Sequence, residues 1–108
     1  MQHYFILNDQ HEPVEVDLLT FCKSDKSIAD TTVAVNTRVW TIFLGTTRDR
    51  DPPEQPCFVH YVFEPGSLYR TADTYGYENA VARHSRIVEW LTKRAEQRAQ
   101  RAAAVKAS

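Results

Sequence analysis

Histidines and cysteines are the residues of this sequence best suited to catalysis or metal binding. Cys57 and His60 are three positions apart in an apolar run typical of a β-strand. Side chains alternate between the two faces of a strand, so this spacing directs Cys57 and His60 to opposite sides and excludes a nucleophile–base pair. No pattern in the sequence pairs Cys22 with a histidine.

His60 and His84 form a second candidate pair. His60 and Glu64 share a strand face but lie ~13 Å apart at ~3.3 Å per residue, too far to bind one metal ion. His84 has no histidine or acidic residue four positions away. The two histidines meet if a helix covers the His60 face of the sheet, and hydrogen-bonded core histidines are the commoner arrangement there. A small enzyme or metal-binding protein that uses His60 and His84 stays open as an alternative.

Longer catalytic motifs are absent from the sequence. There is no GxSxG, no GxGxxG and no phosphate-binding P-loop. We therefore predict no catalytic residue, no metal ligand and no cofactor, and the leading hypothesis is a protein that binds rather than catalyses.

Hydrophobic periodicity predicts several strands followed by a long helix. Apolar runs that alternate or continue predict strands at residues 3–7, 14–16, 31–36, 38–45, 57–64 and 67–71. Asp17 can cap a short helix, and apolar residues at three- and four-residue spacing predict a long helix over residues 77–104. The predicted class is α+β, with an antiparallel, mostly meandering sheet packed on one long C-terminal helix, plus a short N-terminal helix. Residues 1–92 are expected to form a single domain, and residues 93–108 a basic, Ala-rich helical extension or frayed tail.

The C-terminal segment is basic. Residues 1–82 hold 6 Lys/Arg and 12 Asp/Glu, whereas residues 83–108 hold 7 and 2. A helix over residues 77–104 would be about 42 Å long, so its end must overhang the domain, fray or rest on something else. The segment suits a solvated end or, through Arg94 and Arg98, docking on a protein partner or in a homodimer. Nucleic acid is unlikely here, because no aromatic residue follows Trp90 and the rest of the chain is acidic.

Residues 46–56 separate two apolar runs and are expected to form a loop. The segment lacks glycine and contains three prolines, which argues against a phosphate cradle. Its eleven residues exceed the usual hairpin loop, so it is either a self-neutralised connection or a protein-recognition loop. As a recognition loop it would use its charged residues, Arg48, Asp49, Arg50, Asp51 and Glu54.

Aromatic residues and an arginine gather near the predicted junction of sheet and helix. They are Tyr69, Arg70, Tyr75 and Tyr77. Tyrosine and arginine are enriched at interface hot spots, so these residues are candidates for partner binding. Ordinary packing at the junction is the alternative.

The composition suits one globular domain. The chain has 108 residues, of which 43% are hydrophobic, and no apolar run approaches the ~18 residues of a membrane span. No secretory signal precedes the first strand, so a cytoplasmic location is expected. The two cysteines, Cys22 and Cys57, are expected to be reduced and buried.

The order of elements resembles that of a family of small bacteriophage and prophage proteins. The resemblance rests on HYFILND, PVEVDLLTF, VWTIFLG, FVHYVF and YRT, followed by AVARHSRIV, and covers roughly residues 1–88. The chain departs from the family pattern after FLG and where Val59 and His60 replace the family's Glu-Thr. The family has no assigned activity, so the resemblance implies no catalytic residue. It implies a phage origin and action in the host cytoplasm.

The resemblance implies a class of partner. Small phage accessory proteins often bind a host protein, including bacterial defence complexes such as CRISPR effectors. The expected function is therefore binding to a host protein, in the specific form of an anti-CRISPR-like inhibitor of a defence system. A self-assembling phage structural or accessory protein is another alternative.

Overall fold

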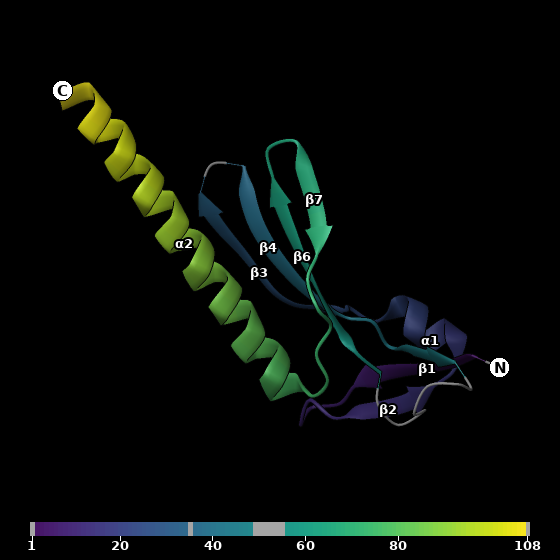
Figure 1. Ribbon diagram of the computed structural model, residues 1–108. Coiled ribbons are helices and arrows are strands. Elements are labelled where there is room, and N and C mark those ends of the chain that lie inside the picture. The colour runs from purple at the N-terminus through teal and green to yellow at the C-terminus, as the bar shows by residue number, and fades with distance from the viewer. Residues whose placement is uncertain (1, 35, 49–55, 108) are drawn as a thin grey trace.

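The computed structural model describes residues 2–34, 36–48 and 56–107. The chain forms two antiparallel sheets, a short helix and one long C-terminal helix (Figure 1). The predicted α+β class is therefore confirmed. The prediction of one meandering sheet is wrong in one respect, because the strands divide into two sheets.

The first sheet has three strands in the order β2-β1-β5. Its strands are β1 (Gln2–Leu7), β2 (Pro13–Val16) and β5 (Thr46–Arg48). The short helix α1 (Leu18–Lys23) follows β2, and the Asp17 carboxylate accepts a 2.8 Å hydrogen bond from the Thr20 amide, as the sequence predicts.

The second sheet has four strands in the order β3-β4-β6-β7. They are β3 (Ser27–Ala34), β4 (Thr37–Phe43), β6 (Phe58–Glu64) and β7 (Ser67–Arg70). Strands β4 and β6 are central, which explains why both of their faces are largely apolar. β3 begins four residues earlier than the sequence pattern indicates.

Gly45 makes the bend that carries the chain from β4 in one sheet to β5 in the other. Its φ is +71°, and its carbonyl accepts a 2.7 Å hydrogen bond from the Phe5 amide of β1. A Cβ at this position would lie 2.7 Å from the Phe21 ring and 2.7 Å from the Phe5 carbonyl oxygen. Only glycine fits both the conformation and the space.

Part of the predicted loop is a strand. Thr46, Thr47 and Arg48 form β5, which pairs with β1 through Tyr4↔Thr46, His3↔Thr47 and Gln2↔Arg48. The prediction of a loop from residue 46 was wrong because three polar residues give no recognisable strand pattern, and their partner strand lies at the N-terminus. Residues 49–55 lie outside the described part of the chain.

Helix α2 (Tyr77–Ala107) covers one face of the four-stranded sheet and continues beyond it (Figure 1). Its 31 residues span about 46 Å. The molecule measures 62 × 25 × 24 Å, and its radius of gyration is 17.5 Å, against ~13 Å for a compact domain of this size. The helix end extends beyond the sheet (Figure 1), which is one of the three arrangements that the sequence leaves open. No helix in the described part of the chain is long and apolar enough to cross a membrane.

The core beneath α2 consists of two hydrophobic clusters. One contains Phe5, Phe43, Phe58 and Ala80, and the other contains Val39, Val62, Ile87 and Leu91. The strand register explains this division, because Val39 pairs with Val62 and Phe43 with Phe58. The pair between them on the same face is Thr41 and His60, which places a polar layer between two apolar ones.

Candidate functional site

The polar layer brings His60 and His84 together. Thr41 on β4 and His60 on β6 are fully buried, and His84 on α2 is 6% exposed. His84 reaches the layer because it lies four residues after Ala80 and three before Ile87, on the core stripe of the helix. The helix therefore covers the His60 face of the sheet, as the sequence argument for a meeting of the two histidines requires.

The two imidazoles meet through a shared hydroxyl. Thr41 Oγ1 lies 2.8 Å from His60 Nδ1 and 2.8 Å from His84 Nδ1. His84 Nε2 lies 2.8 Å from Thr31 Oγ1, and His60 Nε2 lies 2.9 Å from Thr74 Oγ1. All four imidazole nitrogens therefore have a threonine hydroxyl as partner, in one chain that we call the histidine–threonine chain: Thr31, His84, Thr41, His60 and Thr74.

The single hydrogen of the Thr41 hydroxyl sets the direction of this chain. It can be donated to only one of the two Nδ1 atoms, so the other Nδ1 must carry a proton and donate it to the Thr41 oxygen. A neutral imidazole carries one N–H, so one histidine is protonated on Nδ1 and the other on Nε2. The two histidines therefore have opposite tautomers. Changing the tautomer of one histidine reverses the direction of every hydrogen bond in the histidine–threonine chain.

Both histidines are held neutral. Burial lowers the pKa of His60 from 6.5 to about 4, with further contributions from Arg83 and His84 that outweigh the opposing effect of Asp73. Burial also lowers the pKa of His84, and Asp30 opposes this shift. The neutral forms are the ones that the histidine–threonine chain requires, since each imidazole must accept one hydrogen bond in it.

The arrangement is suited to fixing structure rather than to catalysis. A histidine that binds a metal ion or takes a proton from a substrate needs a free nitrogen lone pair. Each nitrogen here would have to lose a threonine partner first. Within the described residues, no three His, Cys, Asp or Glu side chains come together as metal ligands.

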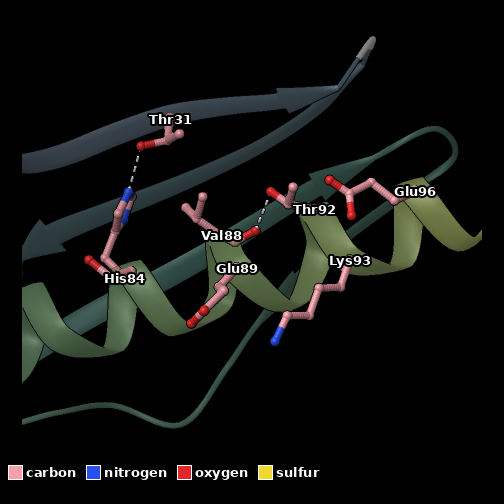
Figure 2. Close-up of a pocket in the computed structure, with 8 residues that line it drawn as sticks. Thr31, His84, Val88, Glu89, Thr92, Lys93 and Glu96 are labelled. Atoms are coloured by element: carbon pink, nitrogen blue, oxygen red, sulfur yellow. Dashed lines mark hydrogen bonds between the residues drawn. The ribbon is translucent and has the colours of Figure 1, made fainter.

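The two ends of the histidine–threonine chain lie at two hollows on the surface of the protein. Thr31 and His84 line one end of a groove of about 550 Å³ between β3 and α2 (Figure 2). In Figure 2, Glu96 lies toward the other end, and the Thr92 hydroxyl donates a hydrogen bond to the Val88 carbonyl. Thr74 lines a second hollow of about 320 Å³. No pattern in the sequence predicts either hollow.

Neither cysteine is placed for nucleophilic catalysis. Cys57 Sγ lies 3.8 Å from an Asp73 carboxylate oxygen, and burial raises the pKa of the Cys57 thiol. A raised pKa keeps the less reactive thiol form. Both cysteines are free, but Cys22 is exposed and Cys57 is only half-buried, so the prediction that both are buried was wrong. Cys22 is exposed because α1 buries none of its residues.

The four residues proposed near the sheet–helix junction do not form one cluster. Tyr69 packs against the Val39 cluster, and Arg70 forms an ion pair with Asp73 at 2.7 Å. Tyr77 stacks on the His11 ring at 3.9 Å. Tyr75 alone of the three tyrosines is well exposed, at 54%, and it lines the same hollow as Thr74.

The remaining predicted contact residues fall in three places. Arg48 belongs to β5, and the charged residues 49, 50, 51 and 54 lie outside the described part of the chain. Arg94 forms an ion pair with Glu64 and stacks over Trp90, whereas Arg98 is exposed. Sequence reasoning missed Arg83 and Arg86, which share a face of α2 with Arg94, and their helical spacing would have identified them.

Comparison with known proteins gives no relative: no protein-family model, curated protein or solved structure matches the chain. The phage resemblance of residues 1–88 therefore stays a prediction.

Proposed function

We propose that this protein is a non-enzymatic binding protein whose helix α2 contacts a host protein. The observation that carries the proposal is the extent of α2 beyond its own core. Leu91 is the last buried residue of the helix, and Arg94 and Ala95 are half-buried. From residue 96 to residue 104 every side chain is exposed.

Such a helix end lacks a source of stability within the chain. Isolated helices shorter than ~12–15 residues are marginal in water, because most helix stability in proteins comes from packing. Residues 96–104 are all exposed, and none of them belongs to either hydrophobic cluster of the described residues. Docking on a partner would supply the missing contact area.

The histidine–threonine chain supports a function without catalysis. It consumes the hydrogen-bonding capacity of both buried histidines, which are the strongest candidates for acid–base chemistry in the sequence. What remains for function is the exposed surface of a rigid scaffold.

The phage resemblance supports a host protein as the partner. On that basis we propose action in the host cytoplasm, with inhibition of a bacterial defence complex as the specific form. The segment of residues 46–56, predicted as a recognition loop with Arg48, Asp49, Arg50, Asp51 and Glu54, remains the alternative contact surface.

Capture from host lysate by three immobilised proteins tests the proposal. They are the intact chain, a chain ending at Gln97, and a chain lacking residues 49–54. The shortened helix keeps every buried residue of α2, so its fold is preserved. We expect a stoichiometric host protein on the intact and loop-deleted chains and none on the shortened chain. A partner retained by the shortened chain would contradict the proposal, as would the absence of any partner.

A further inference from the structure

The arginines of α2 lie on one side of the helix. At about 100° per residue, an arc of about 120° contains Arg83, Arg86, Trp90, Arg94, Arg98 and Arg101, which we call the arginine face. The three glutamates of the helix, Glu78, Glu89 and Glu96, project about 120–140° away from the centre of this arc. Helix α2 is therefore polarised by charge around its axis.

Most arginines of the arginine face form no ion pair with another described residue. Arg38 and Arg70, on the sheet, are paired with Asp30 and Asp73. On the arginine face only Arg94 is paired, with Glu64. Within the described part of the chain, no ion pair reaches the other four, which are Arg83, Arg86, Arg98 and Arg101.

Two adjoining hollows shape the first half of this face. Arg83 and Arg86 line both of them. The hollow of about 320 Å³ also contains Tyr75, and the hollow of about 380 Å³ contains Trp90. Each of these two aromatic side chains is 54% exposed. Unpaired arginines thus lie between two exposed rings.

Trp90 is oriented by its neighbour. The Arg94 guanidinium lies 4.7 Å from the ring centroid, a cation–π contact that favours this orientation of the ring, and about half of Trp90 stays exposed. An exposed, oriented indole beside cationic side chains is suited to stacking on an aromatic group of a negatively charged ligand.

One group of acidic residues lies at the end of the molecule from which α2 starts. Its five members, Asp9, Glu12, Glu15, Asp17 and Asp25, belong to the β1–β2–α1 region. This region lies near the first turns of α2, and the helix runs away from it (Figure 1). From Arg83 to Arg101 the face extends about 27 Å, several times the Debye length of ~8 Å at physiological salt. These five acidic residues therefore screen little of the far half of the face. Near its beginning, Asp73 lines the hollow of about 320 Å³ together with Arg83 and Arg86, but its carboxylate is already paired with Arg70.

We propose that the arginine face binds single-stranded nucleic acid, with phosphates at Arg83 and Arg86 and bases stacked on Trp90 and Tyr75. An extended row of unpaired arginines matches a backbone of regularly spaced charges. Exposed rings match unpaired bases, which a duplex would keep stacked. The ligand lies beyond the proposed function, which concerns a host protein.

Fluorescence anisotropy with fluorescein-labelled dT15 and rU15 tests this proposal. We expect binding that weakens with salt, and Arg86→Glu should weaken it at least about fivefold and lower the salt slope by about 0.7. The matched control is Lys23→Glu, which makes the same charge change at an exposed position in the last turn of α1. It should change the affinity by less than about twofold. Circular dichroism checks that both variants stay folded.

Tryptophan fluorescence reports the stacking. In a Trp40→Phe background Trp90 is the remaining tryptophan. Saturating dT15 should quench its emission, and Trp90→Ala should weaken binding severalfold.

Three results would overturn the proposal. The first is no binding of either oligonucleotide at low salt. The second is equal weakening by Arg86→Glu and Lys23→Glu, which would indicate attraction to net charge alone. The third is binding of a poly-glutamate peptide as tight as that of dT15, which would assign the face to an acidic protein segment. None of these depends on capture of a host protein, so the two proposals fail independently.

Discussion

Thr41 connects two histidines that would otherwise be unsatisfied in an apolar core. A buried imidazole nitrogen without a partner costs about 1–3 kcal/mol, and Thr41 serves one nitrogen of each ring. Its hydroxyl also decides which nitrogens carry protons. At the scale of the residue, one small polar side chain therefore determines both the stability and the protonation pattern of the layer.

Replacing Thr41 by valine should destabilise the protein by about 2–4 kcal/mol, because it keeps the shape and leaves two buried nitrogens unpaired. Urea unfolding measures this change. Thr32→Val, at an exposed position on β3, is the matched control and should stay within about 0.5 kcal/mol of the wild type. Equal effects of the two substitutions would show that the Thr41 hydroxyl contributes nothing.

The tautomers of the two histidines should be opposite. Imidazole ¹⁵N chemical shifts at pH 7.5 should show one ring protonated on Nδ1 and the other on Nε2. The same tautomer in both rings would contradict the shared role of the Thr41 hydroxyl.

Stability should fall as the pH drops from about 6.5 to about 4. The folded-state pKa of His60 is lowered to about 4, so between these values the unfolded chain binds a proton that the folded protein excludes. The loss from His60 alone should be about 3 kcal/mol. The lowered pKa values of Asp17 and Asp30 act only below their ordinary value of 3.8.

Urea midpoints at several pH values measure this dependence. His11→Asn, which changes an exposed histidine with φ of +62°, should keep the slope, since asparagine tolerates that conformation. An unchanged midpoint between pH 6.5 and pH 4 in the wild type would mean that neither buried histidine excludes protons.

At the scale of the element, the division into two sheets depends on the bend at Gly45. Gly45→Ala should cost about 2 kcal/mol or more, since it combines an unfavourable φ with close contacts to Phe21 and Phe5. Gly66→Ala separates these causes, because Gly66 has a similar φ of +75° but no atom within 4 Å of the added Cβ. Equal losses of stability, measured by urea unfolding, would show that the contacts at Gly45 are unimportant.

Elements with strong periodicity could be predicted from the sequence, and elements defined by distant partners could not. The Asp17 cap, the central β4 and β6, and the long α2 follow from local patterns. Strand β5, and with it the division of the strands into two sheets, depends on pairing with β1, which no local pattern encodes.

The candidate site was predictable only in part. The meeting of His60 and His84 follows from the face of the sheet that the helix covers. The three threonines that complete the chain come from β3, β4 and the segment before α2, and threonine is too common in strands to be singled out. Arg83 and Arg86 were detectable by helical spacing.

At the scale of the whole molecule, the protein is a small two-sheet body with a helix that extends beyond it. Asp9, Glu12, Glu15 and Asp17 lie in or beside β1 and β2. Helix α2, which carries the unpaired arginines, runs away from these strands (Figure 1). Removing residues 98–108 should change the free energy of unfolding by less than about 0.5 kcal/mol, because residues 98–104 bury nothing. A larger loss in urea unfolding would show that the helix end supports the fold.

Hydrogen exchange along α2, in the free protein and in its complex with the captured host protein, tests the central claim most directly. In the free protein, amides of residues 80–91 should exchange slowly and those of residues 96–104 quickly, since only the first group packs on a core. In the complex, residues 96–104 should become protected. Fast exchange there in both states would contradict the claim that the overhanging helix is the element that binds the partner.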